Sequence, residues 1–158
     1  MNRPYVFKHF DYVANGRPGT AGTGNAGWNY PLIRYAEVLS IFAEAQNEVL
    51  GGPDVDAYAA LNAIRDRAEL SQLSGLSQAQ FREAVWRERW HELCYEGITW
   101  FDMVRLRKAY IDTEDTFADF VGATLSTAVT LQEKHLLLPL PAQDYRNNTN
   151  LRPDNPGW

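Results

Sequence analysis

The sequence of 158 residues predicts a mainly α-helical fold in which helical hairpins follow one another in tandem. Three observations support this class. Four segments between residues 31 and 110 carry apolar residues at helical spacing. Helix-boundary signals such as Pro31, Ser77 and Gly97 flank these segments. The connectors are short, which favours antiparallel neighbours of the kind that helical-repeat arrays contain.

The first helix is expected from Pro31, which suits a first turn, to the exit at Gly51. One broad face is apolar and consists of Tyr35, Val38, Leu39, Phe42, Ala45 and Val49. Glu37, Glu44 and Glu48 share the other face. An apolar face of this kind usually packs against the core.

The other three helices are expected at about 55–70, 78–96 and 99–110. Asp54 can cap the second helix, whose narrow, alanine-rich seam permits close approach of a neighbour. Ser77 and Gln80 form a capping box at the start of the third helix, and Gly97 can end it. The first and second helices are therefore expected to form one hairpin, and the third and fourth helices a second hairpin.

The remaining segments are expected to be less regular. Residues 1–30 are expected to form an extended lead-in and a glycine-rich loop, and residues 111–127 are ambiguous. Two extended segments are expected, one with Val129 and Leu131 and one from Leu136 to Leu140, followed by a helical turn after Pro141 and a docked tail ending at Trp158. We therefore expect a single domain over 1–158, with two hairpins over 31–110 and an irregular closing segment over 111–158.

The composition excludes several classes of function. The net charge of −5 argues against nucleic acid as a partner, because such binding depends on clustered Lys and Arg. A single cysteine, Cys94, rules out an internal disulfide framework. No apolar run approaches the roughly 20 residues that span a bilayer.

The segment 88–105, ERWHELCYEGITWFDMVR, concentrates four carboxylates, a histidine and two arginines between aromatic and aliphatic residues. Glu88, Glu92 and Glu96 share a helix face with Phe81 and Val85, and the opposite face is also apolar. A helix with two apolar faces lies between neighbours, so some of these glutamates are expected to be buried. Such carboxylates need partners.

A catalytic interpretation would pair two carboxylates as general acid and base. Nearby guanidinium groups oppose it, because they lower the pKa of a carboxylate whereas a general acid needs a raised pKa. A metal interpretation relies on Glu88 and His91 at the spacing of a di-iron ligand pair, but the second such pair is missing. We expect no catalytic residue, metal or cofactor.

The favoured interpretation is a structural salt-bridge network between the hairpins. Arginine suits it because the planar guanidinium meets a carboxylate through two bonds and stays charged when buried. The residues assigned to the network are Glu88, Arg89, Glu92, Glu96, Asp102, Arg105 and Arg65.

Three stretches resemble the C-terminal domain of the SusD/RagB family of outer-membrane nutrient-binding lipoproteins. They are YPLIRYAEVLSIFAEAQNE with ALNAIRDRAEL, then RERWHELCYEGITWFDMVRLRK, and finally LLLPLPAQDYRNNTNLRPDNPGW. The match runs from about Tyr30 to Trp158, and RPYVFKHFDY fits the family's extended lead-in.

The resemblance implies a tetratricopeptide-like α-α superhelix that binds nutrients without enzymatic activity. It implies an oligosaccharide ligand, a location on the surface of the outer membrane and a SusC-like TonB-dependent transporter as partner. Family members are considerably longer and begin with a lipoprotein signal, so the remaining N-terminal part of a larger protein is a further expected partner. The alternatives are a helical-repeat scaffold for a protein partner or a peptide-binding module.

The ligand candidates lie at the end of the glycine-rich loop and in the lead-in. Aromatic side chains offer flat apolar area with a polar edge, which suits sugar recognition, and loops on rigid scaffolds often carry binding residues. The candidates are Trp28, Tyr12, Arg17 and Asn29.

Overall fold

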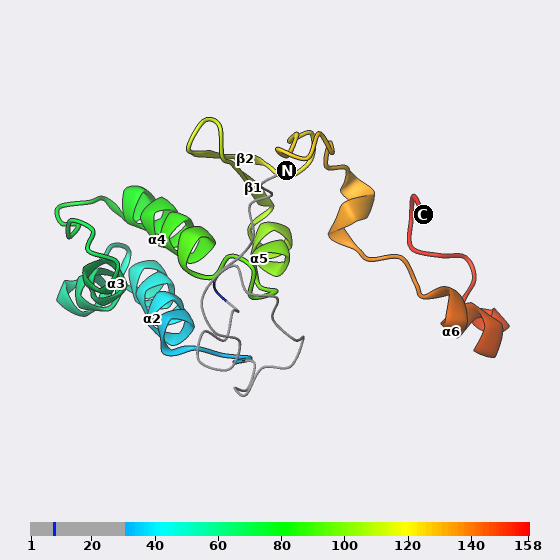
Figure 1. Ribbon diagram of the computed structural model, residues 1–158, viewed down its shortest axis with the longest axis horizontal. Helices are drawn as coiled ribbons and strands as arrows, with labels where there is room; N and C mark the ends of the chain where they lie inside the picture. Colours follow the sequence, from blue (N-terminus) through cyan, green and yellow to red (C-terminus); the bar gives the residue numbers. More distant parts are fainter. Residues whose placement is uncertain (1–7, 9–30) are drawn as a thin grey trace, which may run out of the picture. The chain divides into compact units, whose positions relative to one another are not determined.

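The computed structural model in Figure 1 describes Lys8 and residues 31–158. This part of the chain contains five α-helices, one two-stranded sheet and two short 3₁₀-helices. It divides into two compact units, the first ending at Thr99 and the second beginning at Trp100. The mainly helical class predicted from the sequence is confirmed, while the single-domain organisation stays a prediction. None of the described helices has the length and apolar character needed to cross a membrane.

Three helices that pack on one another form the first unit: α2 (Tyr35–Leu50), α3 (Val55–Arg67) and α4 (Gln78–Glu92), as Figure 1 shows. Local capping sets their boundaries. The Asp54 carboxylate accepts a hydrogen bond from the Ala57 amide at 2.9 Å, and Ser77 and Gln80 form the predicted capping box. Gly51, with φ of 75°, ends α2 in the left-handed conformation that glycine adopts without strain.

Helices α2 and α4 are among those that are shorter than the sequence predicts. Helix α2 begins at Tyr35 instead of Pro31, because Arg34 is still extended and acts as the N-cap residue. Helix α4 ends at Glu92 instead of residue 96, and the turn that follows contains Tyr95 and Gly97 at positive φ. This turn brings Glu96 back beside the end of α4, so that Arg34 can bind both Glu96 and the carbonyl of Glu92.

Small and aromatic side chains fill the core of the first unit. Ala43, Ala57 and Ala60 let the helices approach closely, and Phe81 is fully buried with its ring edge-on to Tyr58 at 5.0 Å. Buried amides cross-link the elements. Asn47 Nδ2 donates to the carbonyl of Gln78, and Asn62 exchanges two hydrogen bonds with the backbone of Leu73. The Asn62 amide and the Asn47 Nδ2 group are thus paired, as burial requires, whereas Asn47 Oδ1 is buried without a hydrogen-bond partner among the described residues.

Most of the apolar face that the sequence assigns to the first helix is exposed, although Leu39 packs against the core, and this corrects the expected packing. Tyr35 is 75% exposed and Val49 is 81% exposed, whereas Ser40, Ala43 and Asn47 on another face are fully buried. Helices α3 and α4 contact the face with small side chains because it permits closer approach. Polar contacts then hold the acidic side of α2 against α4, including Glu48 with Arg82.

From Trp100 onward, helix α5 (Thr99–Leu106) belongs to the second unit, which continues into a hairpin of β1 (Lys108–Ile111) and β2 (Thr116–Asp119). The strands are antiparallel, with Lys108 opposite Asp119 and Ile111 opposite Thr116. Part of the segment left ambiguous by the sequence is therefore a β-hairpin, and the fourth helix ends at Leu106 instead of residue 110. Trp100 meets the buried Phe120 edge-on at 5.9 Å.

The closing segment contains η1 (Glu133–Leu136), α6 (Ala142–Asn147) and η2 (Thr149–Leu151). Helix α6 confirms the helical turn predicted after Pro141. Trp158 Nε1 donates to the carbonyl oxygens of Lys134 and Leu137, both at 3.0 Å, and the Lys134 ammonium lies 4.7 Å from the centre of the tryptophan ring. The predicted docking of the tail is thus confirmed.

Candidate functional site

The four ligand candidates, Trp28, Tyr12, Arg17 and Asn29, lie outside the residues that the structure describes. Their role in binding stays a prediction. Within the described residues, the charged segment of α4 and the turn after it form a site where charged and polar side chains gather around a pocket.

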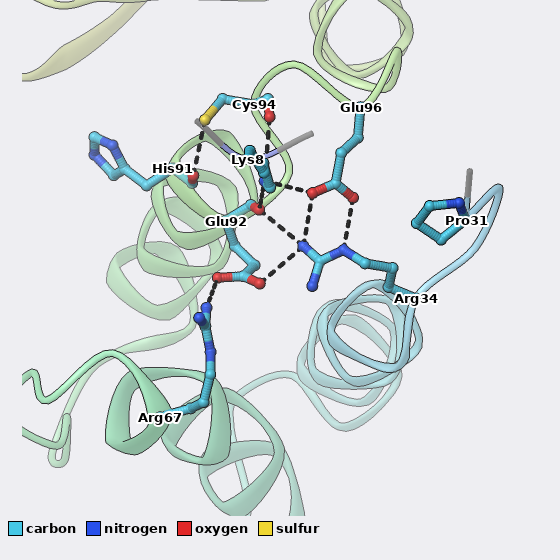
Figure 2. Close-up of a pocket in the computed structure, with 8 residues that line it drawn as sticks. All are labelled: Lys8, Pro31, Arg34, Arg67, His91, Glu92, Cys94 and Glu96. Atoms are coloured by element: carbon cyan, nitrogen blue, oxygen red, sulfur yellow. Dashed lines mark hydrogen bonds and ion pairs between the residues drawn. The ribbon is translucent and has the colours of Figure 1, made fainter. Parts of the chain in front are cut away.

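A pocket of about 590 Å³ lies in the first unit at the C-terminal end of α4 (Figure 2). Figure 2 shows that its charged side chains converge from α4, from the N-cap of α2, from the end of α3 and from Lys8. The lining residues are Lys8, Pro31, Arg34, Arg67, His91, Glu92, Cys94 and Glu96.

Arg34 is the central cation of the pocket. Its Nε and Nη2 donate to the two carboxylate oxygens of Glu96 at 2.7 and 2.8 Å, which is the bidentate geometry that arginine favours. The same Nη2 donates to Glu92 Oε1 at 2.8 Å and to the Glu92 carbonyl at 2.9 Å. Hydrogen bonds from Arg34 to Glu96 and then Glu92 raise the pKa of the guanidinium and outweigh the effect of its burial.

Two further cations complete the arrangement. Arg67, the last residue of α3, donates to the second carboxylate oxygen of Glu92. The Lys8 ammonium pairs with Glu96 and donates to the carbonyls of Glu92 and Cys94, at 2.5 and 3.1 Å. These carbonyls lie at the C-terminal end of α4, where positive charge interacts favourably with the helix dipole.

The other residues assigned to the salt-bridge network are distributed over both units. Arg65 Nη1 donates to Glu88 Oε2 at 2.8 Å, and the Glu88 side chain is only 8% exposed. Arg89 is buried in α4. Asp102 and Arg105 pair with each other along α5, at 3.2 Å.

This geometry disfavours acid–base chemistry on the glutamates. Burial, the largest single influence, raises the pKa of Glu96, but hydrogen bonds from Arg34 and Lys8 together bring it below its usual value. Glu92 has a cation on each oxygen, and Glu88 is paired with Arg65. A carboxylate held in its charged form serves poorly as a general acid. Lys8 and residues 31–158 contain no group of three or more side chains placed to hold a metal ion.

The sequence interpretation assigned none of three cations, Lys8, Arg34 and Arg67, to the network. They lie between 25 and 88 residues from their carboxylate partners. No helical or hairpin spacing connects positions so far apart. The position of Arg34 in the sequence was one available signal. Arg34 directly precedes the apolar pattern of α2, and a long side chain at the start of a helix can reach a neighbouring element.

Tandem helices whose internal carboxylates are paired with cations, followed by a small sheet, describe a helical protein of the tetratricopeptide-like type. The SusD family model matches residues 1–158, and the chain belongs to this family.

Individual relatives agree with this assignment. SusD-like protein P2 of Formosa agariphila is 32% identical over 173 residues, which covers 100% of this chain and 31% of that protein. SusD-like protein P25 of the same organism is 30% identical and covers 94% of this chain and 27% of that protein. The chain thus spans less than a third of the length of these curated relatives.

Solved structures of the superfamily share the fold. A SusD superfamily protein from Parabacteroides distasonis matches with a TM-score of 0.81 and 34% identity, over 88% of this chain and 29% of that one. A SusD homolog from Bacteroides thetaiotaomicron matches with a TM-score of 0.60 and 28% identity, over 86% of this chain and 30% of that one.

Proposed function

We propose that this chain is the helical-hairpin part of a cell-surface protein that binds oligosaccharides and delivers them to a TonB-dependent transporter without chemical conversion. The observation that carries the proposal is the match of the SusD family over the whole chain. The pairing of Glu92 and Glu96 with cations in the pocket, and of Glu88 with Arg65 beside it in α4, supports a binding role over a catalytic one.

For the ligand contacts we propose Trp28, with Tyr12, Arg17 and Asn29 as polar and aromatic neighbours in sequence. An indole ring provides a flat apolar face for a sugar ring, and amide and guanidinium groups can hydrogen-bond its hydroxyl groups. Outer-membrane surface location belongs to the same proposal.

Calorimetric titration of the whole protein with a panel of neutral, acidic and amino-sugar oligosaccharides tests this function. We expect one glycan class to bind and Trp28→Ala to weaken that binding at least tenfold. Tyr35→Ala is a matched control, because Tyr35 is a strongly exposed aromatic residue on α2. Absence of carbohydrate binding, with retained association with the transporter, would contradict the glycan-binding proposal.

A second candidate function, a helical scaffold or peptide-binding module, is favoured by the exposed face of α2. Its apolar residues alternate at spacings of three and four, the pattern that packs against another helix. They are Tyr35, Val38, Phe42, Ala45 and Val49. In this case Val38→Lys should abolish capture of the partner and leave glycan affinity unchanged. Ala63→Lys, on an exposed position of α3, is the control substitution.

A further inference from the structure

The charged pocket joins two points that are far apart along the chain. Lys8 and Arg34 are separated by 25 residues, 9–33, yet both bind the Glu96 carboxylate (Figure 2). Both also donate to the backbone carbonyl of Glu92. One turn after α4 therefore receives both cations.

The two contacts occupy the hydrogen-bond donors of the Lys8 ammonium and both carboxylate oxygens of Glu96. The Lys8 ammonium has three N–H donors, and it meets three acceptors: the Glu96 carboxylate and the carbonyls of Glu92 and Cys94. Arg34 occupies both oxygens of Glu96. The Glu96 side chain is only 5% exposed, whereas the side chains of Lys8 and Arg34 are about 30% exposed. Water therefore screens these pairs less than it screens surface ion pairs.

We infer that Glu96 is a clamp that fixes Lys8 beside Arg34 and so ties this point of the chain to the end of α4. The entropy lost when two points of a chain are brought together grows only slowly with the length between them. A few charge-assisted hydrogen bonds at one buried carboxylate can therefore hold a connection of this length. Lys8 and Arg34 are positioning residues in this inference, and Glu96 is the group on which both depend.

Limited digestion with trypsin tests the clamp, because the rate of cleavage after Lys8 depends on how firmly its side chain is held. The first 34 residues contain four basic residues, Arg3, Lys8, Arg17 and Arg34. Arg3 and Arg17 are each followed by proline, which blocks trypsin. Cleavage in this region therefore requires Lys8 or Arg34, and trypsin must withdraw that side chain from the pocket before it can cut.

We expect the native 158-residue chain to resist cleavage after Lys8, relative to cleavage after the exposed Arg107. In Glu96→Gln, cleavage after Lys8 should accelerate at least tenfold, because the neutral amide no longer pairs with the ammonium. Glu133→Gln is the matched control: the same chemical change at an exposed ion pair in the second unit, with no expected change at Lys8. Equal cleavage after Lys8 in the two variants would overturn the inference.

A measurement on the unmodified chain keeps the inference testable if Glu96→Gln does not fold. The chain has three lysines, Lys8, Lys108 and Lys134. Acetylation by an amine-reactive ester should be at least fivefold slower at Lys8 than at Lys108, whose partner Asp119 is 84% exposed. Equal acetylation rates at these two lysines would overturn the clamp as well.

Discussion

Glu92 shows at the scale of one residue how the charged pocket stabilises the first unit. Its carboxylate is nearly buried and accepts from Arg34 on one oxygen and from Arg67 on the other. Removal of one member of a buried ion pair leaves the others without compensation, which costs more than the pair contributes. Glu92 is thus paired with cations at the ends of two other helices of the unit.

We predict that Glu92→Gln lowers the free energy of unfolding by about 3 kcal/mol, since it leaves Arg34 and Arg67 partly uncompensated. Chemical denaturation followed by circular dichroism measures this change. Glu48→Gln is the control, because the pair of Glu48 with Arg82 is 40% and 31% exposed and should contribute at most about 1 kcal/mol. Equal losses in the two variants would contradict the burial argument.

Glu96 predicts a dependence of stability on pH. Its pKa in the folded protein lies below the ordinary value of 4.5, so the folded state favours the charged carboxylate. This contribution is fully present above pH 4.5 and is lost as the pH falls through the folded pKa. Stability should therefore decline below about pH 4.5, and the difference between the native chain and Glu96→Gln should shrink there. Thermal unfolding at pH 7, 5, 4 and 3 measures it, and a difference that stays constant would contradict the assignment.

At the scale of elements, buried amides determine how the helices connect. The segment between α3 and α4 has no regular structure, yet Asn62 binds both the N–H and the carbonyl of Leu73. Asn62 is 8% exposed. The Asn62 side chain pairs with the backbone of Leu73 as a neighbouring strand would. It thereby holds the segment between α3 and α4 against α3.

We predict that Asn62→Ala destabilises the first unit by about 2 kcal/mol, because both backbone groups of Leu73 lose their partner away from water. Hydrogen exchange should show faster exchange at the Leu73 amide. Gln72→Ala is the neighbouring control, since the Gln72 amide binds Asp66 at an exposed position. Unchanged protection at Leu73 would show that these bonds do not hold the segment.

Particular elements show which parts of the fold could be predicted from the sequence. The starts of α3 and α4 follow from Asp54 and from Ser77 with Gln80, because capping is a local interaction. The face of α2 that is buried could not be predicted, because it depends on which neighbours approach it. The start of α2 and the end of α4 also differ from the prediction. Arg34 is extended where the first turn of α2 was expected, and a turn before Gly97 replaces the expected last turn of α4.

At the scale of the whole molecule, the membership of the SusD family and the neutralised glutamates lead to one expectation about chemistry. A glycan bound by the whole protein should leave it unchanged. Product analysis by mass spectrometry after prolonged incubation measures this. Hydrolysis that disappears in Glu88→Gln, with folding retained, would instead assign an enzymatic function to the charged segment.

The helical class, the starts of α3 and α4 and the family could be predicted without a structure, because periodicity, capping and short motifs are local properties of the chain. The sequence also indicated that the glutamates of α4 need basic partners. Only the tertiary structure decided which partners these are: Lys8 and Arg34 on Glu96, Arg34 and Arg67 on Glu92, and Arg65 on Glu88. The physical reason is that such pairs form between positions far apart in sequence, where packing of the helices sets the distance.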